Sequence, residues 1–230
     1  MAVDFDLLTD IPSLANLLPE TLGQMARHSC LLSIPSGESL YQQGDPPSGL
    51  YILVSGRVKL FRQSQDKMQI LCVLVAGMCF GAESLSTGEM NPYSATTISA
   101  AELVYLSPDS LLELLGFSPD LRVFMLELVT RRLREFAMLI HNLAFRDVPS
   151  RLAAVLVSWS DAEGQMAEDG IRIKRFLSQQ DMASVVGTAR EVLYRTLKKF
   201  EQDEIILLTK KHIIICNKQK LTQIAHRESR

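Results

Sequence analysis

The stretch SQQDMASVVGTAREVLYRTLKKFEQ, residues 178–202, says most about how this chain of 230 residues folds. Ser178 is followed by an acidic residue three positions later and then by an apolar run, which is the pattern of a helix N-cap. Gly187 is expected to end that helix, and Thr188 to cap a second one with Glu191 at the capping-box position. Two helices joined by a tight glycine turn predict a helix-turn-helix.

The second of these helices carries charged side chains that are suited to reading DNA. Arg190 lies in its first turn, and Glu191 and Arg195 are four residues apart and so share one face. Arginine can bind guanine O6 and N7 in a bidentate way, and glutamate can accept from cytosine N4. Lys198 and Lys199, further along, would contact phosphates. Taken singly, Glu191 and Arg195 could equally form a surface ion pair, so the hypothesis depends on the combination.

A candidate wing follows the second helix. Two short apolar runs, 205–208 and 213–216, predict strands joined by the basic tip Thr209-Lys210-Lys211-His212. Lysines placed in this way would contact phosphate, which adds affinity without sequence information. The candidate DNA contacts are therefore Ser178, Thr188, Arg190, Glu191, Arg195, Lys198, Lys199, Lys210 and Lys211.

The chain up to about Pro108 consists of short apolar stretches separated by turn residues. Stretches rich in β-branched and long apolar residues have the length of strands at 50–54, 57–62, 68–75, 95–98 and 103–106. This spacing predicts an antiparallel β-roll or barrel, preceded by a helix over 12–28. The predicted fold class is therefore α+β.

A long helix is predicted beyond Pro119, because no glycine or proline occurs from there until Pro149. Its apolar residues repeat every seven positions, with Leu126, Leu133 and Ile140 each followed three residues later by Val129, Phe136 and Leu143. Such heptads predict that the helix pairs with a second copy of itself. The alternative is a single amphipathic helix that lies on its own β-domain.

Three parts are expected along the chain. They are an effector or sensor β-roll over 1–118, a dimerisation helix and hinge over 119–147, and a winged helix-turn-helix domain over 148–230. The boundary is placed at 147–150 because proline disfavours helix at the residue before it and begins a new helix readily. Within the last part, 151–159 predicts a helix and 161–170 a polar turn.

The composition excludes several classes of protein. With 47% hydrophobic and 22% charged residues the chain is an ordinary folded protein, and its longest apolar run, 70–80, is too short to span a membrane. An acidic start without a basic targeting region predicts a cytoplasmic protein. No nucleophile with a base and no P-loop is visible, so no enzyme is expected.

Residues 171–230 carry 13 Lys or Arg against 6 Asp or Glu on an otherwise acidic chain, which suits a polyanionic partner.

The cysteines are scattered through the sequence at Cys30, Cys72, Cys79 and Cys216. Their spacing predicts neither a metal site nor an iron–sulfur cluster, and buried free thiols are the simplest interpretation. A redox-active pair of Cys72 and Cys79 is the alternative.

The sequence resembles the cyclic-AMP receptor protein and fumarate-nitrate-reduction regulator (CRP/FNR) superfamily of bacterial transcription factors over nearly its whole length. The most specific parts are residues 187–195, similar to the recognition pattern Gly-x-x-Arg-Glu-x-x-x-Arg, and 142–148, similar to the hinge after the dimer helix. The resemblance implies a jelly-roll-like cyclic-nucleotide-binding fold and a homodimer on palindromic DNA. Arg190, Glu191 and Arg195 would read TGTGA-like half-sites, and 161–170 lies where related activators touch RNA polymerase.

The same resemblance places an effector pocket between the roll and the long helix, with departures from the nucleotide-binding pattern. Gly81-Ala82-Glu83 and Tyr93-Ser94 stand where nucleotide-binding members have Gly-Glu for the ribose and Arg-Ser for the cyclic phosphate, so the arginine is missing. Phe136 and Ala137 stand where those members present hydroxyls to adenine. The candidate pocket residues are Gly81, Glu83, Ser84, Tyr93, Ser94, Phe136 and Ala137.

Cyclic AMP is therefore not expected as the effector, because an anion in an apolar pocket needs a cation or several donors. The cofactor stays unknown, with haem and a diatomic gas, a small apolar molecule or a redox signal all open. His28, His141 and the methionines are conceivable haem ligands, although such residues more often serve packing. A nucleotide-binding module that controls a partner protein would explain the roll but not the basic C-terminal segment.

Overall fold

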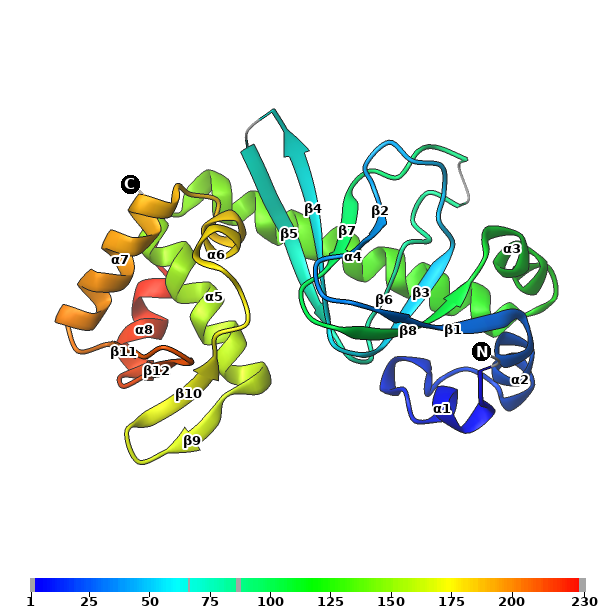
Figure 1. Ribbon diagram of the computed structural model, residues 1–230, viewed down its shortest axis with the longest axis horizontal. Coiled ribbons are helices and arrows are strands. Elements are labelled where there is room, and N and C mark those ends of the chain that lie inside the picture. The colour runs from blue at the N-terminus through cyan, green and yellow to red at the C-terminus, as the bar shows by residue number, and fades with distance from the viewer. Residues whose placement is uncertain (1–2, 66, 86–87, 228–230) are drawn as a thin grey trace. The chain divides into compact units, whose positions relative to one another are not determined.

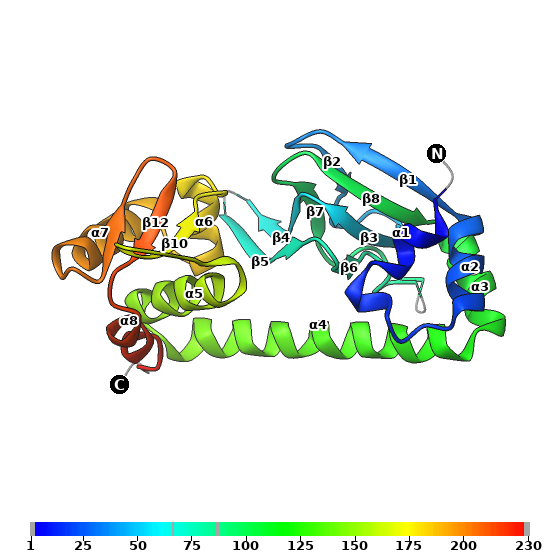
Figure 2. The same cartoon turned by 90° about the horizontal axis from the view of Figure 1, so that it is seen from below.

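The computed structural model describes residues 3–65, 67–85 and 88–227. The chain forms two compact units, Met1–Phe136 and Ala137–Arg230. The long helix α4 (Pro119–Phe145) begins in the first unit and ends in the second (Figures 1 and 2).

The N-terminal unit is built on two antiparallel four-stranded sheets, in the orders β1-β8-β3-β6 and β2-β7-β4-β5. The strands are β1 (Ser29–Ile34), β2 (Ser39–Tyr41), β3 (Leu50–Ser55), β4 (Arg57–Ser64), β5 (Lys67–Val75), β6 (Cys79–Phe80), β7 (Ser94–Thr97) and β8 (Ala101–Leu106). Alternate residues of the two sheets, such as Leu53, Leu60 and Leu103, meet in one buried cluster. The predicted roll is thus confirmed. The five predicted strands correspond to β3, β4, β5, β7 and β8, and the structure adds β1, β2 and β6.

Helices cover the outer side of this unit and enclose a second cluster that includes Leu22, Leu111 and Leu128. They are α1 (Phe5–Thr9), the 3₁₀ helix η1 (Pro12–Leu14), α2 (Pro19–His28), α3 (Pro108–Phe117) and α4. The single helix predicted over 12–28 is wrong, because Leu18 is extended before Pro19 and the chain therefore starts a new helix there. Asp120 accepts hydrogen bonds from the Leu18 amide at 2.8 Å and the Thr21 hydroxyl at 2.9 Å, which fastens the start of α4 to α2.

The C-terminal unit packs its helices on a four-stranded antiparallel sheet of order β11-β12-β10-β9. Its elements are α5 (Val148–Glu163), β9 (Gln165–Ala167), β10 (Gly170–Lys174), α6 (Gln179–Val186), α7 (Arg190–Gln202), β11 (Ile206–Leu208), β12 (His212–Ile215) and α8 (Lys218–Ala225). The core joins residues from most of them, including Leu156, Ala183, Leu193, Ile205 and Leu221.

The polar turn predicted over 161–170 is wrong in form, because the segment ends α5 and then enters the β9–β10 hairpin. Gly170 begins β10 at φ 129°, where a Cβ would lie 2.3 Å from the Ile215 carbonyl oxygen. Glycine is therefore required for the close approach of β10 to β12.

Among the helices in the described residues, none combines the length and the hydropathy that a membrane-spanning segment needs.

Candidate DNA-binding surface and effector site

The first helix of the helix-turn-helix begins as the sequence predicts. The Ser178 hydroxyl accepts a hydrogen bond from the Asp181 amide at 2.9 Å and donates to the Asp181 carboxylate at 2.7 Å. This N-cap satisfies one of the amides that a helix start leaves without a partner. The Ser178 hydroxyl, a candidate DNA contact, is thus already used to fix the start of α6.

The turn between α6 and α7 depends on Gly187, which has left-handed backbone angles of φ 71° and ψ 48°. The amides of Gly187 and Thr188 both donate to the Ala183 carbonyl, which closes α6. Thr188 therefore belongs to this turn, and the predicted Thr188 cap and capping box are wrong. The N-cap of α7 is Ala189, without a side-chain hydrogen bond, and this places Glu191 one position too early to close a capping box.

The exposed face of α7 presents the predicted base readers. Leu193 and Leu197 bury the opposite side in the core, and Arg190, Glu191 and Arg195 are exposed. Within the described part of the chain Glu191 and Arg195 form no ion pair, and the Arg190 Nε donates a 3.4 Å hydrogen bond to the Gln179 side chain. The three charged ends thus lie on the surface rather than in a network of their own.

The two lysines of α7 differ in their surroundings. Lys198 donates to Glu201 at 2.7 Å, and this hydrogen bond raises the pKa of Lys198 and lowers that of Glu201. Glu201 also accepts from the Leu208 amide at 3.0 Å, so the pair ties α7 to the strand β11. Lys199 is exposed at the surface.

The wing is confirmed as the hairpin of β11 and β12, with Lys210 and Lys211 exposed at its tip. Thr209 closes the tip, because its amide and its hydroxyl both donate to the His212 carbonyl at 3.0 Å. Arg175, just before α6, donates to the Thr209 carbonyl at 3.0 Å. These bonds hold the tip in a fixed shape next to the helix-turn-helix.

Two of the predicted effector residues, Gly81 and Tyr93, lie next to a third, Glu83. Its carboxylate accepts from the Gly81 amide at 2.9 Å, and Gly81 has the positive φ of 97° that glycine tolerates. Tyr93 is buried, and the ring of Phe136 meets it edge-on at 6.0 Å. Ala137 is exposed and is the first residue of the C-terminal unit.

The two serines of the predicted pocket have structural partners. The Ser94 hydroxyl accepts from the Gln43 amide at 2.9 Å. Ser84 is buried, and its hydroxyl donates to the Met90 carbonyl at 3.3 Å. Both side chains therefore stabilise loops of the roll.

A charged residue that sequence reasoning missed lies in the same interior. Arg132 of α4 is 6% exposed and forms an ion pair of 3.6 Å between its Nε and Glu83 Oε1. It also donates to Glu135 at 2.6 Å, to the Cys72 sulfur at 3.0 Å and to the Cys79 carbonyl at 3.3 Å. The sequence could have indicated this burial, because Arg132 lies four residues after Leu128 and so continues the buried face of α4.

Among the described residues, the buried hydroxyls of Tyr41 and Tyr93 have no hydrogen-bond partner, and Glu83 Oε1 and Arg132 Nε have only their mutual ion pair at 3.6 Å. Burial, followed by the charge of Glu83, raises the pKa of Tyr93 well above its usual range. Because unsatisfied buried groups are costly, this set is a candidate for contact with a ligand. The interior is therefore more polar than the apolar pocket that the sequence predicted.

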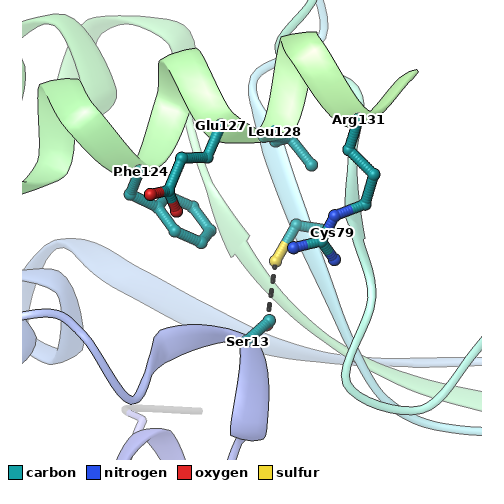
Figure 3. A pocket seen from close by; sticks show the side chains of 6 residues that line it. All are labelled: Ser13, Cys79, Phe124, Glu127, Leu128 and Arg131. Carbon is teal, nitrogen blue, oxygen red and sulfur yellow. Dashed lines mark hydrogen bonds between the residues drawn. The ribbon is translucent and has the colours of Figure 1, made fainter. Parts of the chain in front are cut away.

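A separate small pocket lies between η1, β6 and α4 and is lined by Ser13, Cys79, Phe124, Glu127, Leu128 and Arg131 (Figure 3). The Cys79 sulfur lies 3.6 Å from the Ser13 hydroxyl. Burial raises the pKa of Cys79 to about 11 and that of Cys72 to about 12. Both thiols therefore keep their protons near neutral pH, which is unfavourable for redox chemistry.

The proposed haem ligands have ordinary surroundings in the structure. The His28 ring nitrogen Nδ1 lies 2.9 Å from the Gln24 carbonyl oxygen, and the His141 ring packs against Phe145 at 5.2 Å. In the ranges that the structure covers, no group of three or more His, Cys, Asp or Glu could hold a metal ion.

The predicted dimer residues are mostly exposed along α4. Leu126, Leu133 and Ile140 are 68%, 67% and 66% exposed. Val129 and Leu143 are also exposed, whereas Phe136 packs partly against the interior of the roll. A row of exposed apolar side chains that recur at heptad spacing is unusual on the surface of a monomer.

Comparison with known proteins agrees with these features. Residues 31–116 match the cyclic nucleotide-binding domain, and 150–224 match the Crp-like helix-turn-helix domain. The global nitrogen regulator of Synechocystis sp. is 33% identical over 189 residues, which are 81% of this chain and 84% of that protein. The CRP-like cAMP-activated global transcriptional regulator of Mycobacterium tuberculosis is 27% identical over 208 residues, which are 90% of this chain and 93% of the relative.

Among solved structures, the c-di-GMP responsive global regulator CLP of Xanthomonas campestris superposes with a TM-score of 0.76 and 25% identity. The match covers 85% of this chain and 98% of that one. The similarity thus includes the roll, the long helix and the helix-turn-helix. The chain therefore belongs to the CRP/FNR family of DNA-binding transcription regulators.

Proposed function

We propose that the protein regulates transcription as a homodimer on inverted-repeat DNA with TGTGA-like half-sites, under control of a small-molecule effector other than cyclic AMP. The observation that carries this proposal is the face of α7, where Arg190, Glu191 and Arg195 are exposed together in a unit whose wing tip is also exposed and basic. On this proposal, 1–118 serve as the effector domain, 119–147 as the dimer helix and 148–230 as the DNA-binding domain.

The spacing of the exposed apolar residues supports the dimer. Leu126, Leu133 and Ile140 recur every seven residues, so two copies of α4 can bury them together in a coiled-coil seam. Burying these side chains would stabilise the dimer by roughly 25 cal/mol for each Å² of apolar surface removed from water. Phe136 points to the roll instead, so the proposed seam holds five of the six predicted residues.

The dimer is tested with Leu133→Glu, which places an unpaired charge in the middle of the seam. We expect sedimentation to show a monomer at micromolar concentration, whereas the wild type is dimeric. Leu207→Glu is the matched control, since Leu207 is 43% exposed on the wing strand β11 and lies far along the sequence from α4. A Leu133→Glu variant that stays fully dimeric would place the interface elsewhere.

Electrostatics around Glu83 disfavour cyclic AMP. Arg132, the nearby cation, already pairs with the two carboxylates of Glu83 and Glu135. These three groups sum to one negative charge, so an anionic cyclic phosphate would enter an interior that already repels it. Tyr93, in the place where nucleotide-binding relatives have their arginine, offers one hydroxyl. A ligand without net charge that hydrogen-bonds to the buried hydroxyls of Tyr41 and Tyr93 suits this interior better.

The names of the relatives do not assign an effector to this chain. The Mycobacterium relative is described as cAMP-activated, and the Synechocystis relative as a nitrogen regulator. Isothermal titration with cyclic AMP and cyclic GMP tests the proposal, and we expect no binding below about millimolar concentration. Low-micromolar dissociation constants that raise DNA affinity would overturn it.

The DNA target is tested by selection from a random duplex pool. We expect the wild type to enrich inverted repeats whose arms resemble TGTGA, because arginine and glutamate favour G·C pairs at defined positions. Enrichment of unrelated or non-palindromic sequences would contradict the half-site.

Contact with RNA polymerase through the β9–β10 hairpin, where Met166 is 82% exposed, stays a prediction.

A further inference from the structure

Arg151, in the first turn of α5, makes three hydrogen bonds that all end on backbone carbonyls. Its Nε donates to Val186 at 2.8 Å, its Nη2 to Gly187 at 3.2 Å and its Nη1 to Arg146 at 2.6 Å. Val186 is the last residue of α6, Gly187 is its C-cap, and Arg146 directly follows α4. One side chain therefore joins the ends of two helices that are far apart in the sequence.

The chemistry of these positions suits a guanidinium. The last carbonyls of a helix have no partner within it and carry partial negative charge, so they attract a cation. The guanidinium has five N–H donors in a rigid plane and can bind several acceptors at once, whereas the ammonium of lysine is a compact point charge. Burial lowers the pKa of Arg151, with the charge of Asp147 acting in the opposite direction.

The carbonyls that Arg151 holds lie directly before the recognition helix. Gly187, Thr188 and Ala189 form the whole connection between α6 and α7. Because Ala189 provides no side-chain cap, the start of α7 is fixed by this turn rather than by its own N-cap. A shift of the Val186 and Gly187 carbonyls would therefore be passed on to the first turn of α7.

We propose that Arg151 is a positioning residue for sequence reading: it fixes the turn before α7 against the end of α4, and so sets the orientation of the base-reading side chains. The proposal rests on the proposed function of α7. It also predicts an asymmetry. Bidentate base contacts need accurate alignment, whereas lysine–phosphate attraction tolerates small displacements, so losing Arg151 should reduce specific binding more than non-specific binding.

The test compares the wild type with Arg151→Met, which keeps the aliphatic stem and removes every donor, and with Arg151→Lys. Affinity is measured for a duplex that the wild type has selected from a random pool, and for poly(dI-dC). We expect Arg151→Met to lose about tenfold in affinity for the selected duplex, comparable to one bidentate contact, and to bind poly(dI-dC) unchanged. Arg151→Lys should recover part of the loss.

The matched control is Arg172→Met, because Arg172 is an exposed arginine of the same unit that pairs with Asp169 at 3.1 Å. It should leave both affinities unchanged. Urea denaturation verifies that each variant is folded, and hydrogen exchange should show faster exchange of the Gly187 and Thr188 amides, which both donate to the Ala183 carbonyl, in the Arg151 variants than in the control.

A folded Arg151→Met that keeps the wild-type ratio of specific to non-specific affinity overturns the proposal. If Arg151→Met does not fold, Arg151→Lys decides in the same way, with an unchanged ratio and unchanged amide exchange as the overturning result. A wild type that selects no sequence would instead contradict the proposed function of α7, and the positioning role with it. The two failures are therefore distinguishable.

Discussion

Arg132 of α4 and Arg195 of α7 have the same side chain in opposite surroundings. Arg132 is 6% exposed and pairs with Glu83 and Glu135, whereas Arg195 is exposed on the surface. The free energy of a buried ion pair depends on both partners being present, because either charge alone is costly to bury. An exposed arginine is hydrated, so its removal should affect binding and leave folding intact. The same residue type is therefore expected to stabilise the interior of the N-terminal unit at Arg132 and to take part in recognition on the exposed face of α7 at Arg195.

The largest effect is expected from Arg132→Met. This change leaves the carboxylate of Glu83 in the interior without its cation and should cost about 3–5 kcal/mol of unfolding free energy. Urea denaturation measures it, with Arg134→Met, an exposed position on the same helix, as the control. The double variant Glu83→Gln and Arg132→Met should recover much of the loss. A loss below about 1 kcal/mol would mean that the pair is effectively solvated.

Alkaline pH should weaken the same interior. The folded chain raises the pKa of Cys79 from 9.0 to about 11, so the folded state holds this proton more tightly than the unfolded state. The associated stability is present below about pH 9 and is lost as the pH rises towards 11, by about 2–3 kcal/mol. Unfolding free energies measured from pH 8 to 11 test this, and Cys79→Ala should flatten the decline. An equally steep decline in that variant would assign it to Cys72 and the buried tyrosines.

Arg195→Ala should leave stability unchanged and cost about 1–3 kcal/mol in specific DNA binding, because it removes the proposed bidentate guanine contact. Preference at one base pair of each half-site should relax. Competition gel shifts with single-base variants of the selected duplex measure both quantities. If Arg195→Ala destabilised the fold as Arg132→Met is expected to, the contrast between the two arginines would be lost.

The smallest effect is expected from Lys199→Ala. A phosphate contact adds affinity for all sequences alike, so binding should weaken by a few fold at low salt without a change in base preference. The slope of log K against log salt concentration should become shallower by about 1 for each half-site contacted. Lys198→Ala offers a comparison, since Lys198 is paired with Glu201 and should contribute less to binding. Altered base preference in Lys199→Ala would assign this residue to the base-reading set.

The helix-turn-helix could be predicted because its signals are local. Gly187 has the left-handed backbone that ends α6, and the stripe of Leu193, Leu197 and Phe200 has the period of a helix. The predicted N-cap of α7 was wrong by one position. Thr188 still belongs to the turn that closes α6, where its amide donates to the Ala183 carbonyl, and Ala189 is the N-cap. Periodicity identifies a helix well and its first residue poorly.

Other elements could not be predicted because they depend on partners far away in the sequence. The strand β6 has two residues, Cys79 and Phe80, and exists through pairing with β3. The strand β9 has three residues, none of them buried, and is defined by its pairing with β10. In β10, Ile171 and Ile173 alternate with Arg172 and Lys174, a local strand signal that the predicted polar turn did not include. Arg132 was overlooked because an arginine in a heptad repeat is normally assigned to solvent, and its carboxylate partner lies 49 positions earlier in the chain.

The exposed stripe of α4 also has a consequence for how the regulator responds to its own abundance. If two chains must meet before a palindrome can be held, then at low copy number the amount of active species grows with the square of the amount synthesised. A twofold change in production would then alter promoter occupancy up to about fourfold, until pairing saturates. If Leu126, Leu133 and Ile140 form this seam, the chain would convert a gradual change in gene dosage into a steeper change in output.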